Sequence, residues 1–294
     1  MSISARHSLR ALARTLAGIV AAGLPFAFSV PSLSAQSSYT IAPAAVAAAS
    51  EAGGEHLRLV TPRGIVHVWR PSAYDAKRAG IVVYVHGYFT HVDQAWREDR
   101  LAEQFQARGR NALFIVPEAP ASPRQRVRWK NLPTLLHTAA TASGLRLPRG
   151  PIVAVGHSAA FRTIVNWLPE PRLRCVLLLD GLYRDERQFD SCLRSAPGHE
   201  SHRLVLVADE TTRESEGLAR RFPSALLMDH IPDDLEELTP DDKLAPLLVL
   251  RSQYEHMAIV TSGRVIPLLL GLAPLPALMT PAQAAGADSD GRRD

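Results

Sequence analysis

Apolar runs and amphipathic stretches alternate along most of the chain and predict strands that alternate with helices. Two segments of alternating character, 56–60 and 65–70, flank a turn at 61–64 and indicate an antiparallel hairpin. Nearly continuous apolar runs, typical of strands covered on both faces, occupy residues 80–85, 111–116, 151–155, 174–180, 203–209, 225–229 and 247–251. Amphipathic stretches that predict helices occupy residues 95–108, 132–142, 161–168, 185–193, 213–221 and 256–270. This order implies right-handed crossovers and an α/β fold, a mostly parallel sheet flanked by helices.

The first 35 residues have the pattern of a signal peptide. Arg6, Arg10 and Arg14 precede an apolar run at 15–30, and small residues suited to cleavage follow it. The run is interrupted by Gly and Pro and is short for a membrane span, so we expect cleavage. The sequence therefore predicts export, to a periplasm or out of the cell, with no stable membrane span afterwards.

The remainder divides by composition into three parts. Residues 36–54 are rich in Ala and Ser and are expected to form a flexible leader. Residues 55–279 are expected to form one α/β domain, and residues 280–294 a disordered tail.

Net charge and cysteine content give limited information about binding partners and disulfides. The formal net charge of +4 over 294 residues includes the arginines of the signal peptide, so the mature chain is nearly balanced. We expect no nucleic-acid partner. The two cysteines, Cys175 and Cys192, are compatible with a disulfide or with two free thiols, and both alternatives stay open.

The segment Gly156-His157-Ser158-Ala159-Ala160 carries the candidate chemistry. It joins a buried strand to an amphipathic segment, and the small residues on either side of Ser158 allow strand and helix to approach. A serine on such a tight turn is exposed as a nucleophile, beside free N–H groups at a helix N-terminus. The alternative is an ordinary turn whose serine caps the helix.

Residues 55–272 resemble the α/β-hydrolase fold, in its exported bacterial, serine esterase or lipase-like form. The resemblance depends on the strand order, the Ser158 turn, His86-Gly87 after an earlier strand and a late histidine. It implies a base and an acid after Ser158 in the order Ser, acid, His. The short segment between the strands ending at Asp180 and starting at Arg203 leaves no room for a large cap domain.

The α/β-hydrolase resemblance indicates which histidine and which carboxylate are the preferred catalytic partners of Ser158. His256, after the last strand, is the preferred base, and His230 is the alternative. Asp209 is the preferred acid because it ends the second strand after the nucleophile strand, the usual location in the family. Asp180, which ends the strand before it, is the alternative acid.

The resemblance also implies an oxyanion hole from the backbone N–H groups of Tyr88 and Ala159, with His86 in a structural role. Tyr88, Phe89, Trp129 and Tyr254 are expected to line the substrate site. No metal and no organic cofactor is needed for this chemistry.

A basic stretch follows the strand at 111–116. Arg124, Arg126, Arg128 and Lys130 lie at the end of the sheet where the active site is expected. They are compatible with attraction of an anionic substrate and with an ordinary solvated loop.

The sequence thus predicts an exported serine hydrolase that cleaves carboxylic esters through an acyl-enzyme. An amidase or peptidase acting on cell-wall or peptide substrates with the same triad is one alternative. A non-catalytic binding protein on this fold is another. The expected partner is a small-molecule ester or amide.

Overall fold

The computed structural model describes residues 45–184, 186–194 and 202–279. The predicted signal peptide, residues 36–44 of the predicted leader and the predicted tail lie outside the described residues.

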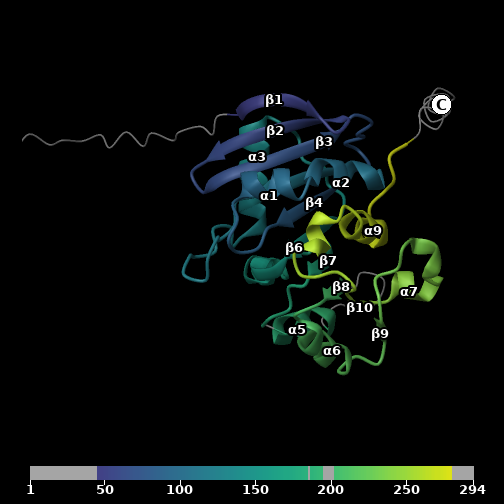
Figure 1. Ribbon diagram of the computed structural model, residues 1–294. Coiled ribbons are helices and arrows are strands. Elements are labelled where there is room, and N and C mark those ends of the chain that lie inside the picture. Colours follow the sequence, from purple (N-terminus) through teal and green to yellow (C-terminus); the bar gives the residue numbers. More distant parts are fainter. Residues whose placement is uncertain (1–44, 185, 195–201, 280–294) are drawn as a thin grey trace, which may run out of the picture. The chain divides into compact units, whose positions relative to one another are not determined.

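A single sheet of ten strands organises the described chain (Figure 1). Its order is β1-β2-β3-β5-β4-β6-β7-β8-β10-β9. The first three strands and the β3–β5 pair are antiparallel, and all later pairs are parallel. The strands are β1 (Ala45–Glu51), β2 (Gly54–Thr61), β3 (Gly64–Pro71), β4 (Gly80–Val85), β5 (Ala112–Pro117), β6 (Ile152–His157), β7 (Leu173–Leu179), β8 (Arg203–Ala208), β9 (Ala225–Met228) and β10 (Leu247–Arg251). The predicted hairpin and mostly parallel sheet are confirmed.

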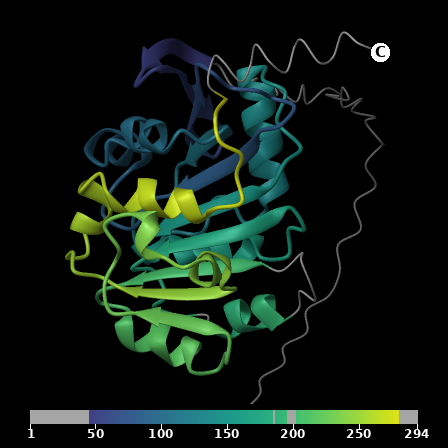
Figure 2. The same ribbon diagram turned by 90° about the vertical axis from the view of Figure 1, so that its right-hand side faces the viewer.

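Helices cover both faces of the sheet, which explains why the central strands are apolar throughout. One face packs against α1 (Val92–Glu98), α2 (Leu101–Arg108), α8 (Ala258–Thr261) and α9 (Val265–Leu272). The other packs against α3 (Leu132–Ser143), α4 (Phe161–Ile164), α5 (Glu186–Arg194) and α6 (Thr212–Ala219). Figure 2 shows the blue and yellow helices on one side of the sheet and the teal helix α3 on the other. The short elements η1 (Ser158–Ala160), η2 (Val165–Trp167), η4 (Leu235–Glu237) and α7 (Pro240–Leu244) complete the described chain.

Two predicted helices are each divided in the structure. The stretch 95–108 forms α1 and α2, because Arg100 adopts a left-handed backbone (φ 48°) that no continuous helix allows. The stretch 256–270 forms α8 and α9, separated at Gly263 (φ 75°). His256 consequently lies in the turn before α8.

Residues 45–51 form a strand, β1, although residues 36–54 were expected to be a flexible leader. From Ala45 to Glu51 the chain pairs with β2 as an antiparallel edge strand. Its Ala-rich sequence has little strand propensity, so backbone hydrogen bonds and contacts of Glu51 with the domain determine this conformation.

The described cysteines form no disulfide. Cys175 is buried in β7 and Cys192 lies half-buried on α5, and both are free. Burial raises the pKa of the Cys175 thiol to about 12 and that of Cys192 to about 11.

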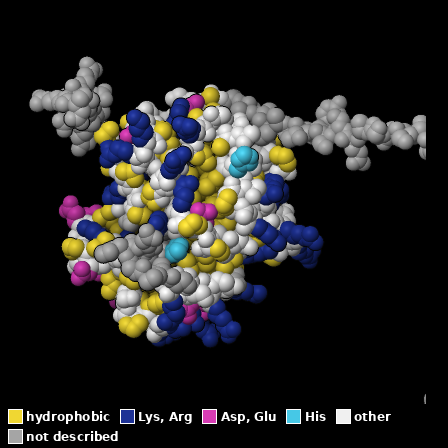
Figure 3. Space-filling model, turned by 180° about the vertical axis from the view of Figure 1, so that it is seen from behind, with side chains coloured by type: hydrophobic (Ala, Val, Ile, Leu, Met, Phe, Trp, Pro, Cys, Tyr) yellow, Lys and Arg dark blue, Asp and Glu magenta, His cyan; other side chains and the backbone are white. Residues whose placement is uncertain are grey.

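None of the described helices is both long and apolar enough to cross a membrane. On the face seen in Figure 3, Lys and Arg side chains cover more of the surface than Asp and Glu do.

Candidate active site

Ser158 lies on a strained turn between β6 and the helical segment that begins with η1. Its backbone is left-handed, with φ 53°, a conformation that costs a non-glycine residue about 1–3 kcal/mol. Gly156 makes the turn possible, because a Cβ there would overlap Ile164 Cδ1 and lie 2.9 Å from Ala160 Cβ. The small residues Gly156 and Ala160, expected to let strand and helix approach, are therefore in contact. Ser158 lies at the carboxyl end of the central strand β6.

Asp180, not Asp209, is the carboxylate paired with the late histidine. His256 Nδ1 donates to Asp180 Oδ2 over 2.6 Å. The described hydrogen bonds of Asp209 use its backbone, with the N–H donating to Asp180 Oδ1 (3.1 Å) and the carbonyl accepting from Thr212. This geometry favours Asp180, the alternative acid of the sequence-based prediction, over the preferred Asp209. Asp180 ends the strand next to β6, and its own left-handed backbone (φ 47°) directs it towards His256.

Asp180 is saturated with donors. Oδ1 accepts from Asp209 N, Thr211 N and Thr211 Oγ1, and Oδ2 accepts from Glu210 N as well as from His256. Burial alone would raise the pKa of Asp180, but these hydrogen bonds, that of His256 foremost, lower it to about 2. The carboxylate is therefore charged at neutral pH.

His256 is held beside the turn by the residue that precedes Ser158. His157 Nε2 donates to the His256 carbonyl oxygen over 3.2 Å, and the two imidazole centroids are 4.5 Å apart. Burial, together with the neighbouring His256, lowers the pKa of His157 to about 3, so this ring is neutral. The hydrogen bond to Asp180 raises the pKa of His256 above its ordinary value. Sequence reasoning missed His157, although its place before the nucleophile was a signal.

The alternative base, His230, is not brought to this site. Its exposed imidazole faces Glu237, with 3.5 Å between Nε2 and Oε2. Of the two candidate histidines, only His256 has a buried carboxylate partner among the described residues.

The loop after β4 lies directly against the Ser158 turn. A Cβ on Gly87 would come within 2.9 Å of Ser158 Cβ, so only glycine allows this approach. His86 Nδ1 donates to the Gly87 carbonyl (2.8 Å), and His86 Nε2 accepts from Ala119 N (3.0 Å). Both ring nitrogens are thus occupied in fixing the loop, in line with the structural role expected of His86. No acceptor is found among the described residues for the N–H groups of Tyr88 and Ala159.

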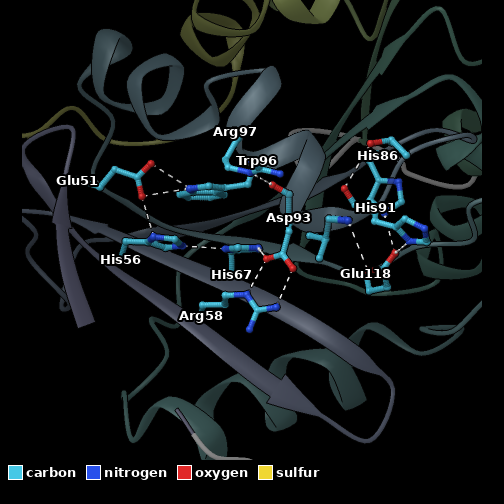
Figure 4. Close-up of polar contacts among 12 residues, drawn as sticks. Glu51, His56, Arg58, His67, His86, His91, Asp93, Trp96, Arg97 and Glu118 are labelled. Carbon is cyan, nitrogen blue, oxygen red and sulfur yellow. Dashed lines mark hydrogen bonds and ion pairs between the residues drawn. The ribbon is translucent and has the colours of Figure 1, made fainter. Parts of the chain in front are cut away.

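A stacked cluster of Glu51, His56, His67, Asp93 and Trp96 anchors α1, the helix that follows this loop (Figure 4). His56 Nε2 and His67 Nδ1 are 2.8 Å apart, Glu51 lies 2.7 Å from His56 Nδ1, and Asp93 lies 3.1 Å from His67 Nε2. The Trp96 ring stacks on both imidazoles, at centroid distances of 4.3 and 4.9 Å, and its Nε1 donates to Glu51. The cluster therefore ties α1 to β1, β2 and β3.

Further contacts hold the start of α1. Arg58 forms a bidentate pair with Asp93, both bonds measuring 2.7 Å. Glu118 faces His86, His91 and the N–H of Val92 (Figure 4). The loop that carries Gly87 and Tyr88 is therefore braced at both of its ends.

Tyr183 and Glu210 complete the surroundings of Ser158 and were missed from the sequence as a pair. The Tyr183 hydroxyl donates to Glu210 Oε2 over 2.7 Å. Burial and then this carboxylate raise the pKa of Tyr183, while a hydrogen bond with Ser158 opposes the shift. The phenol is neutral and lies beside the Ser158 hydroxyl.

Ligand atoms of Asp180, Glu210 and His256 lie within 4.8 Å of one another, a spacing that a metal ion would tolerate. The hydrogen-bond donors around Asp180 argue against that use. Its two oxygens offer about four lone-pair positions, and five donors already occupy them. A cation would have to displace His256 or the backbone.

The four residues predicted to line the substrate site lie in different parts of the structure. Tyr88 lies at the site, where its hydroxyl accepts a hydrogen bond from Arg162, and Phe89 beside it is 87% exposed with φ 62°. Trp129 is 1% exposed and packs in the core, so its assignment to the substrate site is wrong. Tyr254 packs beside Ile231 and Leu268, away from the described contacts of Ser158.

A hollow of about 690 Å³ lies elsewhere in the described chain. It is lined by residues of β1, β2 and β3 together with Tyr74, and by none of the candidate site residues. Its position beside an edge strand gives it no catalytic group of the kind gathered around Ser158.

No family model matches the sequence, and no curated protein matches it. Solved structures with a similar fold include an S-formylglutathione hydrolase from Agrobacterium tumefaciens. It has 12% identity and a TM-score of 0.44, over 78% of this chain and 98% of that one. An S-formylglutathione hydrolase from Staphylococcus aureus has 12% identity and a TM-score of 0.48, over 75% and 96% of the two chains. The feruloyl esterase module from Clostridium thermocellum has 10% identity and a TM-score of 0.48, over 74% and 89%. Identities and TM-scores this low assign no activity to this chain.

Proposed function

We propose that the chain is a serine hydrolase that cleaves carboxylic esters, with Ser158 as nucleophile, His256 as base and Asp180 as the acid. The carrying observation is the 2.6 Å bond from His256 Nδ1 to a buried, charged Asp180, next to a serine on a left-handed turn. An imidazole whose Nδ1–H is fixed in this way presents Nε2 as a proton acceptor. The sequence-based expectation of export belongs to the same proposal.

The proposed reaction is acyl transfer in two steps. His256 Nε2 takes the Ser158 proton while Oγ attacks the ester carbonyl, and the N–H groups of Tyr88 and Ala159 bind the oxyanion. Collapse of this intermediate breaks the C–O bond, and the alcohol leaves with the proton from His256. Water, deprotonated by the same imidazole, then cleaves the acyl-enzyme. Asp180 stabilises the imidazolium in both steps.

Labelling with a fluorophosphonate probe tests the nucleophile, and turnover of p-nitrophenyl acetate and butyrate tests the ester reaction. We expect one label per chain, abolished in Ser158→Ala and retained in Ser72→Ala, an exposed serine on the hairpin side of the sheet. Circular dichroism checks that both variants fold. Equal labelling of Ser158→Ala and wild type would refute the nucleophile. Labelling without turnover of either ester would refute the ester reaction and direct attention to amides.

A further inference from the structure

The loop between β5 and α3 forms one wall of the site around Ser158, and this wall is cationic. The loop is fixed to the site at two places. Phe89 N donates to the Ala121 carbonyl over 2.9 Å, and Arg162 Nη2 donates to the Gln125 carbonyl over 3.2 Å. Ala121 N also donates to the Gln125 side chain, which closes the loop on itself (2.8 Å).

Arg162 connects this loop to the nucleophile. It lies four residues after Ser158, one turn along the same helical segment, and its other guanidinium nitrogen donates to the Tyr88 hydroxyl. The guanidinium also lies over the Tyr88 ring, with its carbon 5.6 Å from the ring centroid. Its described partners are all neutral oxygens, so its charge is not compensated there.

Further positive charge follows from the sequence around Gln125. Arg124 and Arg126 flank that residue directly, and both are exposed, as are Arg128 and Lys130. The ion pairs found among the described residues involve none of these four side chains and not Arg162. Glu118, the nearest carboxylate along the chain, is buried and lies 3.3 Å from His86 Nε2 and 3.5 Å from His91 Nδ1.

The sheet order separates this wall from the acidic part of the site. Strands β4 and β5 lie on one side of β6, and β7 and β8 lie on the other. Tyr88 and the basic loop therefore border one side of Ser158, while Asp180, Tyr183 and Glu210 border the opposite side. A negatively charged substrate would be attracted to the first side and repelled from the second.

We propose that the preferred substrates are esters that carry a carboxylate or another anionic group, bound towards Arg162, Arg124 and Arg126. This inference rests on the proposed function and specifies its substrate class. Neutral esters use the same nucleophile but gain nothing from this wall. The other possible ligand of a basic loop, a polyanion such as heparin, is included in the test as a competing outcome.

The experiment compares kcat/KM for matched anionic and neutral esters. On the acyl side, p-nitrophenyl hydrogen suberate is compared with p-nitrophenyl octanoate. On the alcohol side, the acetate ester of a hydroxynitrobenzoate is compared with p-nitrophenyl acetate. The two pairs distinguish an anion on the acyl part from one on the leaving alcohol. Within each pair, the ratio of kcat/KM for the anionic ester to that for the neutral ester is compared between protein variants, so differences in the intrinsic reactivity of the two esters cancel.

The test variant is the double substitution Arg124→Gln/Arg126→Gln. The matched control is Arg146→Gln/Arg149→Gln, two exposed arginines before β6 and therefore at the opposite end of the sheet from Ser158. We expect the test variant to lower the anionic-to-neutral ratio of kcat/KM roughly 4- to 25-fold in at least one pair, at roughly 2- to 5-fold for each of the two exposed charges. The control should leave the ratio unchanged. In wild type, the preference for anionic over neutral esters should weaken with added salt, since the Debye length is about 10 Å at 0.1 M and exposed charges farther apart than this are largely screened.

An unchanged ratio in the test variant would overturn the proposal, as would an equal fall in the control. Loss of heparin binding without a change in either ratio would also overturn it. Turnover of the neutral esters and fluorophosphonate labelling, measured on the same preparations, report separately on the proposed function. If those fail, calorimetric binding of hydrogen suberate ester to Ser158→Ala, with and without the arginine substitutions, still decides whether the wall binds anions.

Discussion

Replacing Asp180 by Asn gives a sharp test of the site, because the surroundings of this side chain dictate how the amide must sit. Three donors face Oδ1, namely Asp209 N, Thr211 N and Thr211 Oγ1. The amide oxygen must therefore occupy that position, and the NH2 group must replace Oδ2. Asn tolerates the left-handed backbone of residue 180 well, so the turn itself is preserved.

The NH2 group would then face His256 Nδ1 and donate to it. This selects the tautomer with the hydrogen on Nε2, which cannot accept the Ser158 proton. The charge is lost as well. A pKa of about 2 instead of 3.8 reflects about 2 kcal/mol of stabilisation of the charged carboxylate, or roughly 30-fold in rate if it is lost in the transition state. With the tautomer effect, we expect a fall in kcat of about 10⁴-fold.

The assay is the second-order rate of fluorophosphonate labelling, together with kcat/KM for p-nitrophenyl acetate. The NH2 group also opposes Glu210 N, a conflict that costs about 1–3 kcal/mol of folding free energy, so urea unfolding must confirm that the variant is folded under assay conditions. Asp209→Asn is the matched control, since its described hydrogen bonds use the backbone and survive the change. Activity of Asp180→Asn within tenfold of wild type would refute the assignment, and so would an equal loss in Asp209→Asn.

Two further predictions concern pH. The bond to Asp180 raises the pKa of His256 above 6.5. Because the base must be neutral to accept the Ser158 proton, kcat/KM should rise with pH through a midpoint above 6.5. A midpoint below 6.5, or a midpoint that shifts in His230→Ala, would contradict this assignment. Burial and the neighbouring His56 lower the pKa of His67 to about 4, so between pH 6.5 and 4 the unfolded chain binds more protons than the folded one. The free energy of unfolding should therefore fall on acidification across that range, by up to about 3 kcal/mol. Urea titrations should find this dependence reduced in His67→Gln and retained in His137→Gln, an exposed histidine; an equal dependence in all three proteins would exclude His67 as its source.

The elements that the sequence predicted well are those with a strong period. Apolar runs placed the strands from β4 to β10 within a residue or two, because strands buried on both faces can hardly be composed otherwise. The Ser158 turn was found from the small residues around it, a purely steric requirement. Helix breaks at Arg100 and Gly263 were not found, since a single left-handed residue leaves the amphipathic pattern on either side intact.

The acid and the pocket depend on geometry that adjacent residues do not encode. Asp180 and Asp209 each follow a buried strand, and only the donors supplied by Thr211 and the Asp209 backbone show which carboxylate accepts the imidazole. Trp129 sits among arginines in the sequence, yet its ring packs inward and its carbonyl accepts from Trp167 Nε1 (2.7 Å). In a long loop, the direction of a side chain is determined by contacts with residues distant in the sequence. The pattern of hydrophobic and polar residues along the loop does not predict it.

The contacts of Glu51 define where the functional unit begins. Its backbone carbonyl accepts from Trp69 Nε1 (2.9 Å), and its carboxylate faces His56 and accepts from Trp96 Nε1 (3.0 Å). A chain trimmed at residue 54, the boundary suggested by composition, would leave two indoles and an imidazole without these partners and would loosen the helix behind the Gly87 loop. An expression boundary compatible with an intact site must therefore lie before Glu51. Proteolytic removal of β1 would therefore impair the active site, although β1 is an edge strand of the sheet and Ser158 follows the central strand β6.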